Sequence, residues 1–221
     1  MGIAMALRLD VRSVVDALVD SLRERIFSEQ LPGGAAVTEL EVAAEYDVAR
    51  PTAKTAIERL VGEGLLVREQ HRSARVLLLD ADEVEDLYFA RGCLEESAMR
   101  RLALTRAAVP DEALKAAADM EDALAARDTL TFVDGDIQFH RSFIDALGSA
   151  RLSRAHGLLL SETRLCMAQV QTHDLIRPTQ IIEEHRRILA ALQTADPEAA
   201  GAAVTEHLLL AKRALTAHLR R

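Results

Sequence analysis

Four side chains in the second half of the sequence have the types and spacing of a metal-binding site. Asp136 precedes His140 by four residues, so on a helix the carboxylate and the imidazole would lie one turn apart on one face. His185 and His207 lie at equal distances from residue 196, where an Asp-Pro pair separates two expected helices. Residues equidistant from the turn of an antiparallel helix pair come level, so we expect these two imidazoles to face each other.

Such a set of nitrogen and oxygen ligands suits a divalent transition metal. We favour Zn²⁺, with Ni²⁺ or Mn²⁺ as alternatives, and one coordination position would remain for water or a ligand oxygen. The spacing alone leaves open that these histidines are hydrogen-bonded core groups or exposed ones. His156, His173 and His218 have no partner at a useful spacing, so we expect them to be ordinary surface groups.

The composition favours helices as the elements that position these side chains. Of the 221 residues, 49% are hydrophobic and only 3% aromatic, and residues such as Ala and Leu lose little rotamer freedom on a helix. We expect Cys93 and Cys166 to be buried core thiols rather than a disulfide, as in a reducing compartment. No stretch resembles a membrane span or a signal peptide, which predicts a soluble, cytoplasmic protein without a membrane partner.

The first 79 residues have the pattern of a winged helix-turn-helix. Apolar residues at three- and four-residue spacing predict an amphipathic helix over about 11–29. A capping-box pattern at Thr38 predicts a short helix to about Tyr46, and Pro51 opens a third helix that ends near residue 62. Two apolar strands, 65–67 and 76–79, then flank a basic segment that would form the wing.

Positive charge is concentrated in this part of an otherwise acidic chain. The formal net charge is −8, yet residues 49–76 hold six basic and three acidic groups. Arg50, Thr52 and Lys54 cluster at the amino end of the third helix, where a recognition helix meets base edges or phosphates. Arg59 and Arg72 are candidates for phosphate contacts. For each residue taken singly, an ordinary solvated side chain is the alternative.

Residues 80–221 predict an antiparallel α-helical bundle, so the whole chain is expected to be mainly α, with a DNA-binding domain over 1–79 and a second domain over 80–221. Breaks at Pro, Gly and Asp residues separate the expected helices by short connections, which favour antiparallel neighbours. The six expected helices cover residues 82–106, 111–126, 129–147, 150–174, 179–194 and 197–220.

Residues 14–79 resemble the winged helix of the GntR family of regulators. The family's recognition segment reads Val-Ser-Arg-Thr-Pro-Val-Arg-Glu-Ala-Leu, and this chain reads Val48-Ala49-Arg50-Pro51-Thr52-Ala53-Lys54-Thr55-Ala56-Ile57. The first Arg is kept as Arg50, the second is replaced by Lys54, and the Thr-Pro pair is inverted. Lys54 cannot make the bidentate contact of an Arg, and Ala49 stands where the family has its capping Ser.

Residues 82–221 resemble the FCD ligand-binding domain of FadR-type GntR regulators, in particular the six-helix, VanR-like, metal-binding subgroup. Its metal-binding members carry Asp-x-x-x-His followed by two further His, which matches Asp136, His140, His185 and His207 in order and type. The segment around Arg91 resembles the family's first effector-domain helix, where an Arg faces the cavity. The resemblance thus implies Arg91 as an anchor for a carboxylate, with a surface ion pair to Glu95 as the alternative. Arg164 is a second candidate.

The sequence therefore predicts a transcriptional regulator rather than an enzyme. We expect a homodimer that binds a short palindromic DNA operator and responds to a small organic acid bound beside the metal. A metal sensor, in which the ion itself is the effector, is the first alternative. A metal-dependent hydrolase is the second, although no additional acid or base is found near the expected ligands and the winged helix would be unexplained.

Overall fold

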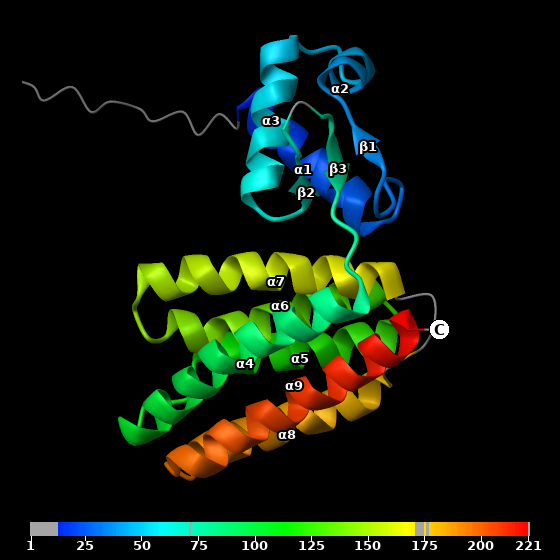
Figure 1. The fold of residues 1–221 in the computed structure, drawn as a ribbon. Helices are drawn as coiled ribbons and strands as arrows, with labels where there is room; N and C mark the ends of the chain where they lie inside the picture. The colour runs from blue at the N-terminus through cyan, green and yellow to red at the C-terminus, as the bar shows by residue number, and fades with distance from the viewer. Residues whose placement is uncertain (1–12, 71, 171–174, 176, 221) are drawn as a thin grey trace, which may run out of the picture. The chain divides into compact units, whose positions relative to one another are not determined.

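A computed structural model describes residues 13–70, 72–170, 175 and 177–220 of the chain. The chain divides into two compact units, Met1–Val76 and Leu77–Arg221, and each is described by itself. Among the described residues, no helix is long and apolar enough to cross a membrane. The structure confirms the mainly helical fold class, with one small sheet in the first unit (Figure 1).

The first unit packs three helices against a three-stranded antiparallel sheet. The helices are α1 (Val14–Phe27), α2 (Glu39–Glu45) and α3 (Arg50–Gly62), and the strands are β1 (Ala36–Val37), β2 (Leu66–Val67) and β3 (Ala74–Val76). The strand order is β1-β3-β2. Apolar faces of α1 and α3 form the core, in which Leu22, Ile57 and Leu60 are almost completely buried. This arrangement fixes the amino end of α3 next to the turn that follows α2.

Local sequence sets where these helices begin. Ser13 caps α1 and exchanges hydrogen bonds with Asp16 in a capping box, and Thr38 caps α2 through the amide of Glu41. At α3, Ala49 has the extended backbone of an N-cap but makes no side-chain capping bond, and Pro51 lies in the first turn. The recognition helix thus begins one residue before the expected Pro51 and without the cap that its neighbours have.

The sheet differs from the expected hairpin in two respects. The short strand β1 was not expected, and it pairs with β3 through Ala36 and Val37. The prediction of a strand over 76–79 is wrong, because the strand pairing of β3 ends at Val76. The apolar residues that follow belong to the second unit instead. Leu79 is buried in its core, and the carbonyl of Leu77 accepts a hydrogen bond from Gln169.

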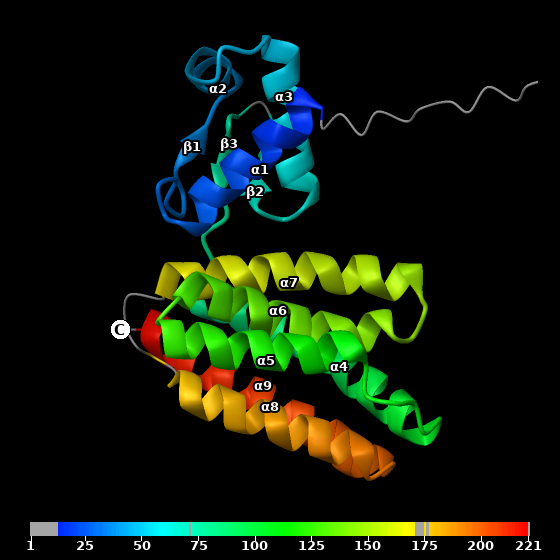
Figure 2. The same cartoon turned by 180° about the vertical axis from the view of Figure 1, so that it is seen from behind.

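The second unit is a bundle of long helices joined by short connections (Figures 1 and 2). Its described helices are α4 (Ala81–Leu104), α5 (Asp111–Ala126), α6 (Thr129–Asp145), α7 (Ala150–Val170), α8 (Pro178–Gln193) and α9 (Pro197–Leu219). Each observed range lies close to the expected one. Residues 171–174, which the sequence assigns to the end of the fourth helix of this bundle, lie outside the described residues.

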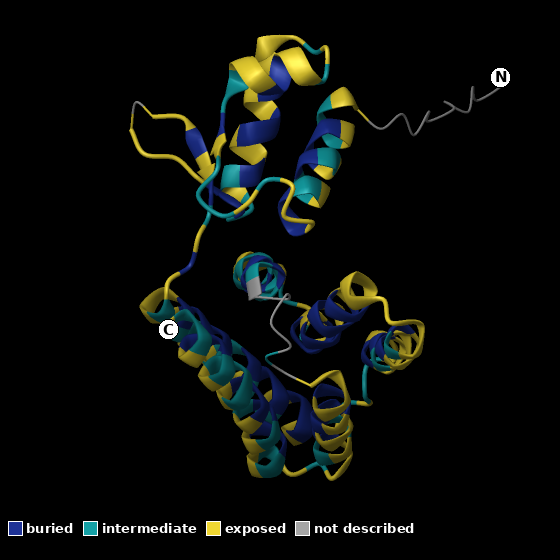
Figure 3. Ribbon diagram, turned by 90° about the vertical axis from the view of Figure 1, so that its right-hand side faces the viewer, coloured by how far each residue is buried: buried dark blue, intermediate teal, exposed yellow. Residues whose placement is uncertain are grey.

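Aspartates at the connections explain several of the bundle's helix starts. Asp80, Asp128 and Asp196 accept hydrogen bonds from amides of the first turns of α4, α6 and α9. The inward faces bury Phe139, Ile188 and other apolar side chains, and Figure 3 shows the buried faces of these helices turned toward the interior of the bundle. The same inward faces also carry buried polar groups, which mark the candidate site.

Candidate metal centre

The four predicted ligands come from three helices and meet inside the bundle. Asp136 and His140 lie one turn apart on α6, His185 lies on α8, and His207 lies on α9. Each is at most 6% exposed, and one ligand atom from each lies within 4.8 Å of all the others. The rings of His185 and His207 have centroids 4.8 Å apart, as expected for residues level across the α8–α9 turn.

The separations between these atoms suit a metal ion. Nε2 of His140 lies 3.1 Å from Nε2 of His207, and Nε2 of His185 lies 3.3 Å from Oδ1 of Asp136. In a tetrahedral site with metal–ligand bonds of about 2.0–2.1 Å, neighbouring ligand atoms are about 3.3 Å apart. Beyond this contact with Asp136, which is not a well-formed hydrogen bond, neither nitrogen of His185 has a hydrogen-bond partner among the described residues, although the ring is buried and stacked on Phe139. A buried imidazole whose nitrogens make no hydrogen bond is costly unless something binds it.

Two carboxylates outside the ligand set orient two of the imidazoles. Nδ1 of His140 donates to Oε2 of Glu95 at 2.6 Å, and Nδ1 of His207 donates to Oε2 of Glu184 at 2.8 Å. A neutral imidazole has one ring proton, so both Nε2 atoms then carry lone pairs that face each other. A cation between them converts this repulsion into coordination.

The protonation states also suit metal binding. Burial lowers the pKa of His185 to about 4, and it lowers the pKa of His140 despite the neighbouring Glu95. Burial alone would raise the pKa of Asp136, but contact with His185 and the other two histidines lowers it below its ordinary value. His140 and His185 are therefore neutral imidazoles and Asp136 is an ionised carboxylate, the forms that bind metals.

The buried charges around the site are unbalanced without a cation. Glu95, Asp136 and Glu184 are carboxylates at most 5% exposed, and Arg91 is the guanidinium that faces them. Among the buried groups, three carboxylates thus meet one guanidinium. Uncompensated buried charge is expensive, and a divalent ion would balance this cluster. The residues present therefore fit a divalent metal.

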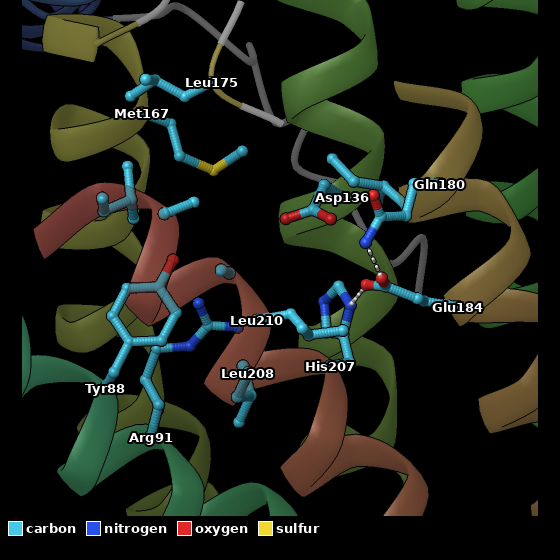
Figure 4. A pocket seen from close by; sticks show the side chains of 14 residues that line it. Tyr88, Arg91, Asp136, Met167, Leu175, Gln180, Glu184, His207, Leu208 and Leu210 are labelled. Carbon is cyan, nitrogen blue, oxygen red and sulfur yellow. Dashed lines mark hydrogen bonds and ion pairs between the residues drawn. The ribbon is translucent and has the colours of Figure 1, made fainter. Parts of the chain in front are cut away.

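A cavity of about 120 Å³ adjoins the ligands. Figure 4 shows Tyr88 and Arg91 on one side of it and Asp136, Gln180 and Glu184 on the other. His207 also lines it, and the remaining described wall is apolar and consists of Met167, Leu175, Ile181, Leu208, Leu210, Ala211, Ala214 and Leu215. A small molecule in this space would meet the metal ligands at one end and a guanidinium at the other.

Arg91 lines this cavity and also pairs with Glu95. The two roles considered from the sequence, a cavity residue and an ion-pair partner of Glu95, therefore do not exclude each other. The pair is buried, with Nε of Arg91 2.8 Å from Oε1 of Glu95, and is not the surface pair that was considered. The guanidinium lies over the ring of Tyr88, 5.2 Å from its centroid. Within the described residues its Nη2 has no hydrogen-bond partner, which leaves a buried donor beside the cavity.

Three other expectations differ from the structure. Arg164 is not among the residues that line the cavity; it lies on α7 and pairs with Asp134 of α6. His156 is not a surface group, since it is 1% exposed and its Nε2 lies 2.9 Å from Oε1 of Glu95. Cys93 is exposed rather than buried, because its face of α4 points away from the core. His173 lies outside the described residues.

The predicted DNA-contacting residues lie on the exposed surface of the first unit. Arg50 and Lys54 are exposed and Thr52 is half-buried at the amino end of α3. Lys54 lies 3.6 Å from Glu58 one turn away, and Arg72 pairs with Glu69 in the wing. Arg59 behaves differently, because it pairs with Asp16 of α1 and Glu63 and so ties two helices together.

Sequence reasoning missed the residues that support the ligands. Glu184 lies next to His185 in sequence, a weak signal that it belongs to the site, although the imidazole that it supports is that of His207 on α9. Glu95 and His156 gave no such signal, because Glu95 of α4 contacts His140 of α6 and His156 of α7 contacts Glu95. Tyr88 precedes Arg91 by one turn, which is a helical spacing that predicts a shared face.

Comparisons with known proteins agree with this architecture. Residues 15–76 match the family of bacterial regulatory proteins, gntR family, and residues 86–210 match the FCD domain. The chain is 30% identical over 205 residues, 93% of its own length and 90% of the other, to a protein from Paenarthrobacter nicotinovorans named "Probable D-xylose utilization operon transcriptional repressor".

Two solved structures have a similar fold. A GntR regulator from Rhodococcus sp. RHA1 is 21% identical and superposes with a TM-score of 0.79, covering 91% of this chain and 96% of the other. The metal-free FCD domain of TM0439 is 18% identical, with a TM-score of 0.54, and covers 65% of this chain and 98% of that domain.

Proposed function

The chain belongs to the GntR family of bacterial regulatory proteins and carries an FCD domain, and we propose that a small organic acid bound beside a divalent metal controls its binding to operator DNA. Proteins of this family are transcriptional regulators, so the chain is a regulator and not an enzyme. The observation that carries the proposal is the buried set of four ligands next to a cavity with a buried guanidinium.

In this proposal Asp136, His140, His185 and His207 bind the metal, with Zn²⁺ as the favoured ion and Ni²⁺ or Mn²⁺ as alternatives. The bound ion would supply a Lewis-acidic position for an oxygen of the effector. Apolar side chains of α7, α8 and α9 form much of the cavity wall and would limit the access of water to the site.

Arg91 is the proposed anchor for the other end of the effector. Its free Nη2 and the hydroxyl of Tyr88, both beside the cavity, are donors that suit a carboxylate. Burial strongly raises the pKa of Tyr88, so this hydroxyl keeps its proton and donates. A carboxylate would accept from this unpartnered Nη2 at one end and offer an oxygen to the metal at the other, and the proposed effector is therefore an acid.

The DNA contacts are assigned to Arg50, Thr52 and Lys54 at the amino end of α3, with Arg72 of the wing and Arg59 as phosphate contacts. Arg50 has no ion-pair partner among the described residues, so its five N–H donors remain available to base edges. We propose that the protein acts as a homodimer on a short palindrome, because two symmetric half-sites match two recognition helices. An effector changes operator affinity only if it binds better to one of the two DNA-binding states.

Fluorescence anisotropy tests the proposal on operator DNA that the protein itself selects from a random pool. Metal-free protein is titrated with Zn²⁺, and the metal-saturated protein is then titrated with lactate, malate and citrate, with xylose as the neutral control. A change in operator affinity with an acid, while the protein keeps its metal, is the expected result. A change with Zn²⁺ alone and none with acids would identify a metal sensor, and no change in either titration contradicts both.

A further inference from the structure

Glu95 contacts the metal centre from a helix that supplies none of its four ligands. It lies on α4, and its buried carboxylate accepts hydrogen bonds from three side chains. Oε2 accepts from Nδ1 of His140 at 2.6 Å, whereas Oε1 accepts from Nε of Arg91 at 2.8 Å and from Nε2 of His156 at 2.9 Å. Donors from α4, α6 and α7 therefore meet on one carboxylate.

We infer that Glu95 is a positioning residue of the metal centre, which holds the ring proton of His140 on Nδ1 and so keeps the Nε2 lone pair directed at the other ligands. The inference rests on the proposed metal site. A neutral imidazole presents a lone pair at one nitrogen only, and the hydrogen bond at the other nitrogen selects which one. Carboxylates that accept from a ligating histidine fix its ring and increase its basicity.

The other two donors explain why the carboxylate stays in place. A glutamate side chain has several rotatable bonds, and a single hydrogen bond would not define its orientation. Arg91 and His156 both bind Oε1 and thereby leave Oε2 facing His140. His156 thus supports the metal centre from α7 without being a ligand, because only its Nε2 points to Glu95 and its Nδ1 has no partner among the described residues.

An amide in place of the carboxylate cannot satisfy all three donors. In Glu95→Gln the side chain has one oxygen and one NH₂ group. If the oxygen faces Arg91 and His156, the NH₂ group faces His140 and favours the tautomer with its proton on Nε2, which cannot coordinate through that atom. If the oxygen faces His140 instead, the NH₂ group meets the N–H groups of Arg91 and His156. Either arrangement weakens the site, although the side chain is nearly the same size.

The test measures the Zn²⁺ dissociation constant of the full-length protein by competition with a chromophoric chelator. Loss of an outer carboxylate typically weakens metal binding by about 10- to 100-fold, and we expect this for Glu95→Gln. Glu96→Gln is the matched control, because the neighbouring carboxylate is half-buried and contacts Arg100 and Thr205 rather than a ligand. Its Zn²⁺ affinity should equal that of the wild type.

Histidine ¹⁵N chemical shifts give a readout that a purely structural role would not move. In metal-free wild type the proton of His140 should lie on Nδ1, and in Glu95→Gln a shift to the Nε2 proton is expected. Equal Zn²⁺ affinity and an unchanged tautomer in Glu95→Gln would overturn the inference. Failure of the wild type to bind Zn²⁺ would instead overturn the proposed metal site itself.

If Glu95→Gln does not fold, a second pair of variants tests whether Glu95 positions His140. His156→Leu removes one donor to Glu95, whereas His156→Gln places an amide N–H near the position of the lost Nε2 donor. The inference predicts weaker Zn²⁺ binding in the leucine variant and recovery in the glutamine variant. Equal affinities in both variants and the wild type would refute it.

Discussion

The basic side chains on α3 differ in whether they already form ion pairs with neighbouring acidic side chains. Arg59 pairs with Asp16 and Glu63, and Lys54 lies near Glu58, whereas Arg50 makes no ion pair with any described residue. Exposed pairs of this kind contribute little to stability, about 0–1 kcal/mol, but they reduce the charge that is presented to DNA. At the scale of single residues, Arg50 is therefore the strongest candidate for reading the operator.

Arg50→Ala should weaken specific operator binding by about 1–3 kcal/mol, because a guanidinium contact to a base edge or phosphate is lost. The measurement is anisotropy of labelled operator DNA at fixed salt concentration. Arg141→Ala, which removes an equal charge from an exposed position on α6, is the control and should bind as the wild type does. Undiminished binding by Arg50→Ala would show that α3 is not oriented toward the DNA as proposed.

The two cysteines should react very differently with iodoacetamide. Cys93 is exposed, whereas burial raises the pKa of Cys166 to about 12, so Cys166 presents almost no thiolate at neutral pH. Mass spectrometry of native protein should find one modified thiol, at Cys93, and urea-denatured protein should carry two. Rapid modification of Cys166 in the native protein would contradict its placement in the core.

At the scale of elements, the close approach of α5 and α6 depends on one glycine. A Cβ atom at Gly135 would lie 2.5 Å from Cγ of Met120 and 3.3 Å from the carbonyl oxygen of Ala116. The missing side chain lets the two helices pack tightly directly beside Asp136. This packing sets the position of the α6 face that carries Asp136 and His140, so a packing residue governs the geometry of the site.

Gly135→Ala should therefore lower the free energy of unfolding by about 1–3 kcal/mol, the usual cost of overpacking a core. Gly157→Ala is the matched control on α7, where an added Cβ meets nothing within 4 Å. There the gain in helix propensity should stabilise the protein by about 0.5–1 kcal/mol. Urea denaturation followed by circular dichroism measures both, and equal effects of the two substitutions would disprove the steric argument.

At the scale of the whole molecule, the second unit combines a stable core with an electrostatically costly centre. Its apolar cluster joins residues from α4 to α9, but three carboxylates and four imidazoles lie among them. A ligand that binds the folded state and not the unfolded chain stabilises it by mass action. The metal is thus expected to act on stability as well as on effector binding.

Zn²⁺ at about 100 times its dissociation constant should add about 2.7 kcal/mol to the stability of the folded protein. Thermal unfolding with and without a chelator, followed by circular dichroism, measures the shift in midpoint. Asp136→Asn keeps the side-chain volume but loses the anionic ligand, so most of the shift should disappear in this variant. The same shift in both proteins would place the bound zinc elsewhere.

The sequence by itself determined the helices of the bundle and which of the predicted ligands would lie near each other. The spacing of Asp136 and His140 follows from the 3.6-residue turn, and the level positions of His185 and His207 follow from a short antiparallel connection, so both could be read from residue numbers. Tertiary structure alone decided that Glu95 and His156 reach this site and that Arg164 does not line the cavity. It also decided that Leu77 and Leu79 pack against the bundle instead of extending the sheet. Those contacts join helices far apart in the chain, and which faces meet depends on the packing of the entire core, which no local spacing encodes.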